Sequence, residues 1–297
     1  NNKTKVSTET SGALALVLGA DYTCTITNTA IQPKLTVKKH VDNGNTGGTK
    51  TASDFRMNVS GNNVSDNSFN GSEQGTTVTL NVGNYTVSEG DHDGYTMTTQ
   101  GDCNGSVNLG DAKTCTIKNT AIAPTLKLVK KAVNDNGGTV KAGGFTLTAA
   151  GKTFTGNSYS TYGNTTTTNP YTVTGVKAGA ANKVTVSELT KSGYSVTSII
   201  CKDDRNQIVA STTSKNSLDV TLALGQNVTC TVTNDDVAPK LTLKKEVINN
   251  NSGTSKAKNW LKSTGISKKK LPKEKGLNRR TVPVKRNSGA FFSVFVI

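Results

Sequence analysis

The sequence predicts an all-β protein made of tandem domains, and two observations lead to this prediction. Thr, Val, Asn, Gly and Ser dominate the 297 residues, which is the usage of strands joined by turns. Apolar and polar residues alternate in many short windows, whereas no window keeps an apolar period of 3.6 residues. The clearest alternating windows are Thr77 to Leu80, Tyr85 to Glu89, Phe145 to Ala149, Val184 to Glu188 and Val220 to Leu224.

One segment occurs three times and shows how these strands are organised. Its copies run from Cys24 to Lys39, from Cys115 to Lys131 and from Cys230 to Lys245. Each copy has an alternating strand that ends near an Asn, a linker with one Pro, and a second alternating strand that ends in two Lys. Repetition on this scale indicates an array of similar domains, and each copy spans the junction between two of them.

The linker prolines set the expected domain boundaries. Two complete units of ordinary domain length are expected at 33–123 and 124–238. Residues 1–32 match only the C-terminal part of such a unit, and residues 239–261 match only its start. Residues 262–297 form a basic tail for which three interpretations stand: a frame-shifted or aberrant, unfolded terminus, which we favour, a basic extension that contacts anionic polymers, or a sorting signal.

The net charge of +15 lies mostly in that tail. Residues 256–297 contain twelve Lys and Arg residues and one acidic residue, Glu274. The repeats are therefore close to neutral, and their lysines are expected on solvated strand faces. We expect no specific nucleic-acid partner. The sequence also has no apolar run long enough to span a membrane.

The five cysteines follow the repeat. Cys103 and Cys115 fall in the first complete unit, and Cys201 and Cys230 fall in the second, so each unit has one pair. This distribution predicts two disulfides and an oxidising, extracellular compartment, with buried free thiols as the alternative. No CxxC motif is present, and the partner of Cys24 would precede Asn1.

Period-two spacing places three polar groups of each unit toward the core. In the first unit Lys39 follows Leu35 and Val37 on one face, Glu89 follows Tyr85 and Val87, and Asn119 follows Cys115 and Ile117. The second unit repeats the pattern with Lys130, Glu188 and Asn234.

Burying such groups unpaired is costly, so they are expected to form a hydrogen-bonded network or to react. Burial lowers the pKa of a Lys amine toward the neutral, nucleophilic form, and this amine can attack an Asn carboxamide with loss of ammonia. The Glu would serve as the general acid and base of this single turnover.

Two stretches carry a family resemblance: NYTVSEGDHDGY from Asn84 to Tyr95, and VTVSELTKSGY from Val184 to Tyr194. With the Cys-containing last strand and the opening strand after each Pro, they resemble the Cna-B-type and SpaA-like repeat domains of bacterial cell-surface proteins. The resemblance covers about residues 10–260. It implies tandem immunoglobulin-like β-sandwich domains of the transthyretin, or prealbumin, type, strung as stalks and adhesins on cell walls.

Many members of that family carry a Lys–Asn isopeptide bond promoted by an acidic residue. The resemblance implies Lys39, Glu89 and Asn119 as the candidates in the first unit, and Lys130, Glu188 and Asn234 in the second. The adjacent Lys38 and Lys131 leave open which amine faces inward. Outward-facing Lys and turn-capping Asn are the alternative.

No cofactor, metal site or enzyme activity on an external substrate is expected. The oxygen-rich runs Asp42 to Thr49 and Asn134 to Thr139 resemble calcium loops, but we expect tight turns there because Asn-Gly and Gly-Gly supply positive φ. Neither a Ser-His-Asp order nor a phosphate-binding Gly loop occurs.

The sequence therefore predicts stalk or spacer repeats of an exported, adhesin-like cell-surface protein, stabilised by disulfides and isopeptide bonds. Its expected partners are neighbouring repeats and an unidentified cell-wall or host ligand. The alternative is a module that binds a glycan or a host protein through long loops in the second unit, at 159–171 and 203–215.

Overall fold

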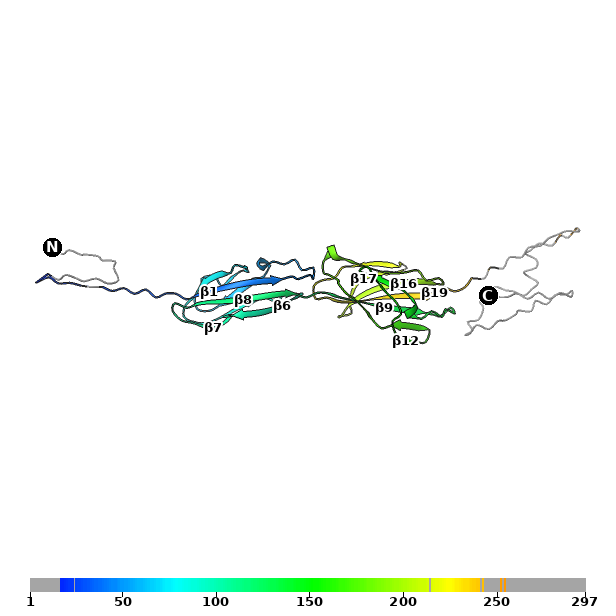
Figure 1. Cartoon of the computed structure of the whole chain (residues 1–297), viewed down its shortest axis with the longest axis horizontal. Coiled ribbons are helices and arrows are strands. Elements are labelled where there is room, and N and C mark those ends of the chain that lie inside the picture. Colours follow the sequence, from blue (N-terminus) through cyan, green and yellow to red (C-terminus); the bar gives the residue numbers. More distant parts are fainter. Residues whose placement is uncertain are drawn as a thin grey trace.

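The computed structural model describes residues 17–240, apart from Cys24 and Ser214, together with Thr242, Ser252 and Thr254. Two β-sandwich domains follow one another along the long axis of the molecule (Figure 1). The predicted tail at 262–297 and residues 1–16 lie outside the described residues, as does most of the incomplete repeat at 239–261. No helix in the described part is long and apolar enough to cross a membrane.

The first domain has eight strands and one short 3-10 helix. In chain order they are β1 (Lys34–Asp42), η1 (Ala52–Asp54), β2 (Arg56–Ser60), β3 (Ser68–Asn70), β4 (Thr76–Thr79), β5 (Gly83–Glu89), β6 (Tyr95–Gly101), β7 (Asn104–Val107) and β8 (Ala112–Ala121). They form two sheets of four strands, in the orders β4-β1-β8-β6 and β3-β2-β5-β7.

The first and last strands of this domain lie side by side. β1 pairs with β8 in parallel over the whole of β1, from Lys34 opposite Ala112 to Asp42 opposite Thr120. The chain therefore enters the domain at one end and leaves it at the other, as the extended arrangement of Figure 1 requires.

The second domain repeats this plan with additional strands. Its elements are β9 (Thr125–Val133), η2 (Ala142–Gly144), β10 (Leu147–Ala149), β11 (Lys152–Phe154), β12 (Tyr159–Tyr162), β13 (Thr165–Thr168), β14 (Tyr171–Val173), η3 (Ala180–Asn182), β15 (Val184–Glu188), β16 (Tyr194–Asp203), β17 (Ile208–Thr213), β18 (Ser217–Val220) and β19 (Asn227–Asp236). One sheet has the order β12-β13-β9-β19-β16-β17, with β14 also on β9, and the other is β11-β10-β15-β18.

The alternating pattern fills the space between the two sheets of each domain. The fully buried apolar side chains come from the positions that the period-two spacing places inside. They include Leu35, Val37, Met57, Val78, Leu80, Cys115 and Ile117 in the first domain, and Leu126, Leu128, Leu147, Val186, Ile199, Cys230 and Val232 in the second.

Three sequence-based expectations differ from the structure. Both inserts of the second unit were expected as long loops, but they form β12, β13 and β14 at 159–173 and β17 at 208–213, because their Thr- and Tyr-rich runs find ladder partners. The strand expected from Val220 to Leu224 ends at Val220, because the chain turns at Gly225, where φ is +68°.

The third difference concerns the segment that follows Cys24. Alternation predicts a strand there, but the described residues from 25 to 33 belong to no strand, and Ile26 is 83% exposed. An isolated strand is not stable without a partner ladder, and none lies beside this segment among the described residues.

Both predicted disulfides are present. Cys103 is bonded to Cys115 and Cys201 to Cys230, with sequence separations of 12 and 29 residues. Each bond ties the last strand of its domain to the chain that precedes it. Cys24 lies outside the described residues.

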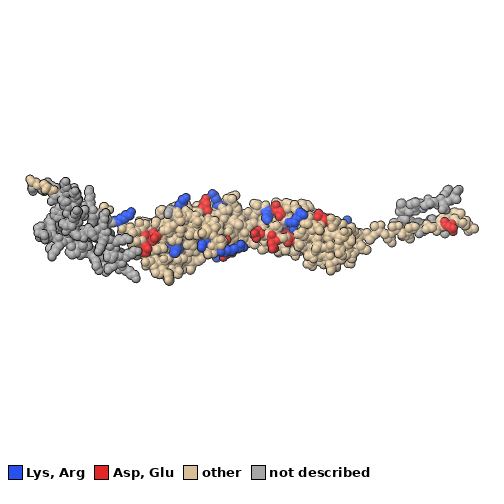
Figure 2. Space-filling model, turned by 180° about the vertical axis from the view of Figure 1, so that it is seen from behind, with Lys and Arg blue, Asp and Glu red and all other residues tan. Residues whose placement is uncertain are grey.

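Charged residues of both signs are interspersed over the two domains. Figure 2 shows no extended patch of a single sign on the face that it presents. Surface ion pairs such as Lys118 with Asp42 and Lys183 with Asp219, each at 3.0 Å, are typical of this pattern. The folded domains thus match the near-neutral charge expected for the repeats.

Candidate cross-linking site

In the first domain, three strands bring the predicted polar residues together between the two sheets. Alternation along β1 turns Lys39 inward and leaves Lys38 exposed, which settles which of the two amines enters the core. Glu89 ends β5 in the opposite sheet. Asn119 lies near the end of β8, opposite Val41 in the parallel register.

Glu89 bridges the other two residues. The Lys39 Nζ lies 2.8 Å from Glu89 Oε2, and the Asn119 Nδ2 donates a hydrogen bond of 2.5 Å to Glu89 Oε1. Lys39 has no exposed surface, and the Glu89 side chain is 1% exposed. Burial lowers the pKa of Lys39, and the neighbouring Glu89 carboxylate opposes part of this effect.

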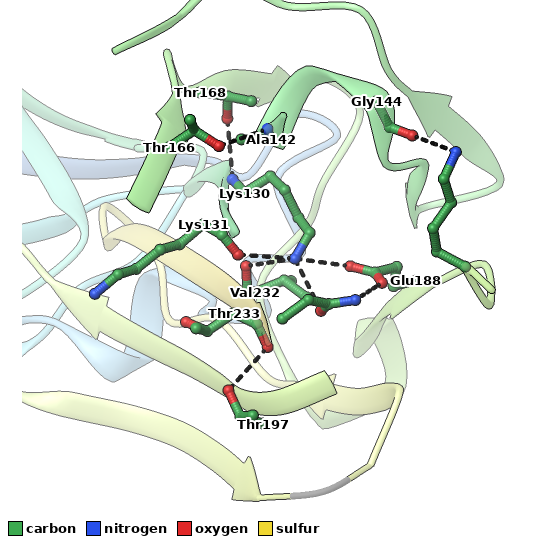
Figure 3. Close-up of polar contacts among 12 residues, drawn as sticks. Lys130, Lys131, Ala142, Gly144, Thr166, Thr168, Glu188, Thr197, Val232 and Thr233 are labelled. Atoms are coloured by element: carbon green, nitrogen blue, oxygen red, sulfur yellow. Dashed lines mark hydrogen bonds and ion pairs between the residues drawn. The ribbon is translucent and has the colours of Figure 1, made fainter. Parts of the chain in front are cut away.

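The second domain places its three residues in a similar arrangement, and Figure 3 shows Lys130 with its contact to Glu188. Lys130 comes from β9, Glu188 from the end of β15, and the Asn234 side chain from β19. The Lys130 Nζ lies 3.1 Å from Glu188 Oε2, and Asn234 Nδ2 donates a short hydrogen bond to Glu188 Oε1. All three residues are buried.

The Lys130 amine also reaches the Asn directly. Its Nζ donates to Asn234 Oδ1 at 2.8 Å, and it contacts the carbonyl oxygens of Lys131 at 3.0 Å and Val232 at 3.2 Å. Burial lowers the pKa of Lys130 to about 8, against the opposing effect of Glu188. A substantial fraction of this amine is therefore neutral near pH 8.

The first domain lacks that direct contact. Lys39 Nζ is instead paired with Glu89 at 2.8 Å, and the buried Asn119 Oδ1 has no hydrogen-bond partner among the described residues. An unsatisfied polar atom in a core carries a free-energy cost.

The two domains match one family model, the prealbumin-like fold domain of the SpaA type, at residues 31–123 and 121–232. These two segments together span more than half of the chain. The chain belongs to this family. Among curated proteins, none matches the sequence.

Several solved structures resemble the tandem prealbumin-like domains in chain path. The major pilin from Streptococcus pyogenes is 16% identical, with a TM-score of 0.32, and the similarity covers 70% of this chain and 99% of the pilin. A C-terminal fragment of the pilus adhesin SpaC from Lactobacillus rhamnosus GG is 14% identical, with a TM-score of 0.35 and coverages of 70% and 99%. The Bacillus anthracis TIE protein is 15% identical, with a TM-score of 0.36 and coverages of 70% and 34%.

Each prealbumin-like domain also places an aromatic ring against its buried amine. The Nζ atoms of Lys39 and Lys130 lie 4.4 Å from the ring centroids of Phe55 and Phe145, respectively. A cation over an aromatic face is stabilised electrostatically, and the ring also excludes water. The site predicted from sequence omitted both rings, although each Phe follows the Gly-rich turn after the opening strand at a similar distance.

A tyrosine joins each ring to the turn after the opening strand. Tyr95 packs edge-on against Phe55, with centroids 5.5 Å apart, and its hydroxyl donates to Asn43 Oδ1 at 2.7 Å. In the second domain Tyr194 packs against Phe145 at 5.1 Å and donates to Asn134 Oδ1 at 2.7 Å. The Gly-rich turn and the buried amine are thus parts of one packed unit.

The turn of the second domain is held by a carboxylate. Asp236 accepts hydrogen bonds from the backbone N–H groups of Asp135, Asn136 and Gly138. Asp135, Asp235 and Asp236 also lie with their carboxylate oxygens within 4.8 Å of one another. Because Asp236 is already bonded to the loop backbone, its position is explained by the tight turn that the sequence predicts.

A surface cleft reaches the second site from outside. It runs between β16 and the end of β15, and its lining includes Lys191, Val196, Lys215, Glu188 and Asn234. Glu188 and Asn234 are thus among the residues that line this cleft.

Proposed function

We propose that this chain is a stalk or spacer segment of an exported cell-surface protein of the pilus type, and that a Lys–Asn amide bond locks each prealbumin-like domain. The observation that carries the proposal is the pair of buried Lys-Glu-Asn groups at matching positions of the two domains. In both, the carboxylate contacts the amine with one oxygen and the carboxamide with the other.

The reaction is a transamidation within each domain. The fraction of Lys130 that is neutral reacts, and its Nζ attacks Cγ of Asn234. The Glu188 carboxylate takes one proton from Nζ and passes it to Nδ2. The bond between Cγ and Nδ2 then breaks, ammonia leaves, and Glu188 returns to the carboxylate.

The first domain carries out the same step with Lys39, Glu89 and Asn119. The amide product removes the buried ammonium charge, whose desolvation is a continuing cost in the unlinked state. Oδ1 of Asn119 stays in the product as the carbonyl oxygen of the new amide. Loss of the buried ammonium charge is therefore the effect that favours the linked form.

A structural role is consistent with the rest of the two domains. Each link would join the first strand to the last, and each disulfide adds a second covalent tie on the last strand. Disulfides persist in oxidising compartments, which supports export. We infer that neighbouring repeats are the immediate partners and that the domains act on no external substrate.

Mass spectrometry of the intact protein tests this proposal. The reduced chain should be lighter than its sequence mass by two ammonia, and peptide mapping should find Lys39 joined to Asn119 and Lys130 joined to Asn234. The Glu89→Gln and Glu188→Gln variants should each lose one link and keep the other. A parent chain with the full sequence mass would refute the cross-links.

A matched control separates the proposed role of the glutamates from a general effect of charge removal. Glu73→Gln removes a carboxylate that pairs with His40 on the surface of the first domain, at 2.8 Å. Both links should form in this variant. If Glu73→Gln abolished the first link as Glu89→Gln does, the assignment of Glu89 as the proton shuttle would be wrong.

A further inference from the structure

The first site lies at the end of its domain that faces the second domain. Lys39 and Asn119 are near the C-terminal ends of β1 and β8, and the chain runs from β8 directly into β9 (Figure 1). The loop from Glu89 to Tyr95 and the turn that contains Asn43 are at the same end.

The second domain contacts both of these segments and the linker that follows β8. Ala178 donates its N–H to the carbonyl oxygen of Thr46 at 2.7 Å, and Gly225 donates to the carbonyl oxygen of Ile122 at 2.8 Å. Gly94 packs so closely on Leu224 that a Cβ added to Gly94 would lie 2.3 Å from the Leu224 Cβ.

A short chain of contacts leads from this junction to the buried amine. Thr46 donates its side-chain hydroxyl to the carbonyl oxygen of Asn43 at 2.8 Å, and Asn43 accepts from Tyr95. Tyr95 packs on the Phe55 ring, which lies against Lys39. The packing of Leu224 on Gly94 acts on the Glu89 carboxylate, because Gly94 ends the loop that Glu89 begins.

In the second domain, a side chain of the same domain holds the turn after the opening strand β9. Asp236 lies opposite Tyr194 in the β16–β19 register and binds the backbone of the turn. The residue opposite Tyr95 in the β6–β8 register is Ala121, which has no side-chain acceptor. The first turn therefore lacks a carboxylate from the last strand. Its own Asp42 accepts a hydrogen bond from the N–H of Gly44 at 3.1 Å, and Thr46 in the turn meets the neighbouring domain.

We propose that the second domain positions the cross-linking site of the first, with Ala178 and Leu224 as positioning residues, whereas Asp236 positions the site of the second domain internally. This inference rests on the proposed function for its chemical readout. Contacts at the junction fix the turn behind Tyr95 and the loop behind Glu89, which holds the amine and the carboxylate in reacting geometry.

Leu224→Asp tests the inference without changing the first domain. The new carboxylate would meet Gly94 and the adjacent Asp93, and should separate the junction by desolvation and like-charge repulsion. The full chain is made by cell-free synthesis, quenched in denaturant at intervals and mapped by mass spectrometry. We expect the Lys39–Asn119 link to form at least about tenfold more slowly, because a misplacement of reacting groups by about 1 Å can cost about a hundredfold in rate.

The rate of the Lys130–Asn234 link in the same molecules is the internal control and should not change. Tyr162→Asp adds the same charge at a 91% exposed position of the second domain and should leave both rates unchanged. Asp236→Ala should slow only the second link. An unchanged first link in Leu224→Asp would overturn the inference, and so would an equal slowing of both links.

Hydrogen exchange tests whether the second domain holds the turn and the loop of the first domain in place, and it does not require the cross-linking reaction. In an Asn119→Ala, Asn234→Ala chain, in which neither link can form, Leu224→Asp should speed exchange of the amides in 43–48 and 90–95 and leave those of 134–139 unchanged. Absence of links in the parent chain would refute the proposed function but not this arrangement. Unchanged exchange in 43–48 and 90–95 would refute the arrangement itself.

Discussion

The Nζ atom of Lys130 donates a hydrogen bond of 2.8 Å to Oδ1 of Asn234, although 104 residues separate the two in sequence. The first and last strands of the domain carry them, and the parallel register places Asn234 opposite Ala132, two residues beyond Lys130. Nearly the whole domain is therefore enclosed between two side chains that are already in contact.

Asn234→Ala should lower the stability of the second domain substantially. A covalent link across about 100 residues reduces the entropy of the unfolded chain, an effect of about 4.7 kcal/mol before any overlap with the disulfide. This corresponds to a fall in Tm on the order of 10 °C, measured by calorimetry. Asn164→Ala, at an exposed position of the same domain, is the control and should leave Tm within about 1 °C of the parent.

The second link should form faster as the pH rises. Burial lowers the pKa of Lys130 to about 8, so the neutral amine is scarce at pH about 6 and predominant at pH about 9. The initial rate after synthesis should rise by about tenfold per pH unit below the pKa and level off above it. A rate that falls over this range would exclude the neutral amine as the nucleophile.

Tyr194→Phe should destabilise the second domain by about 1–3 kcal/mol. The hydroxyl donates to Asn134 and accepts from the backbone N–H of Val140 at 2.9 Å, and phenylalanine leaves both groups without their partner. Chemical denaturation of an unlinkable Asn234→Ala chain measures the difference. Tyr162→Phe, which changes a 91% exposed tyrosine, should have no measurable effect.

Removing the disulfides should affect the domains unequally. The Cys201–Cys230 bond closes a longer loop than the Cys103–Cys115 bond, with separations of 29 and 12 residues. The chain-entropy model gives about 3.6 and about 2.8 kcal/mol, respectively. Paired Cys→Ser variants of each bond, compared by denaturant unfolding, should show the larger loss in the second domain. The reverse order would indicate that the unfolded-chain argument does not govern these bonds.

Local sequence patterns predicted the inward-facing polar residues because facing depends only on alternation along single strands. Lys39, Glu89 and Asn119 each continue an apolar row, and the structure brings all three together. The same reasoning predicted no partner for Phe55. Its contact with the amine depends on how the turn after β1 folds back across the sandwich.

Features that depend on partners distant in sequence could not be read from one strand at a time. The segments at 159–173 and 208–213 have strand-forming composition, but only the exposed edges of neighbouring strands decide that they join the sheet. The role of Asp236 likewise depends on a turn about 100 residues earlier. The sequence around Gly94 does not indicate its close packing on Leu224, because this contact arises from the position of the next domain.

The parallel pairing of β1 with β8 determines how much chain a pulling force can extend. Tension that enters at Lys34 would pass along β1 to Lys39, cross the proposed amide bond to Asn119, and leave at Ala121. Residues 40–118 would lie outside this path and carry no load. A linked domain would then add only a few residues of contour length to the stretched chain, and single-molecule extension should show no unfolding step for it.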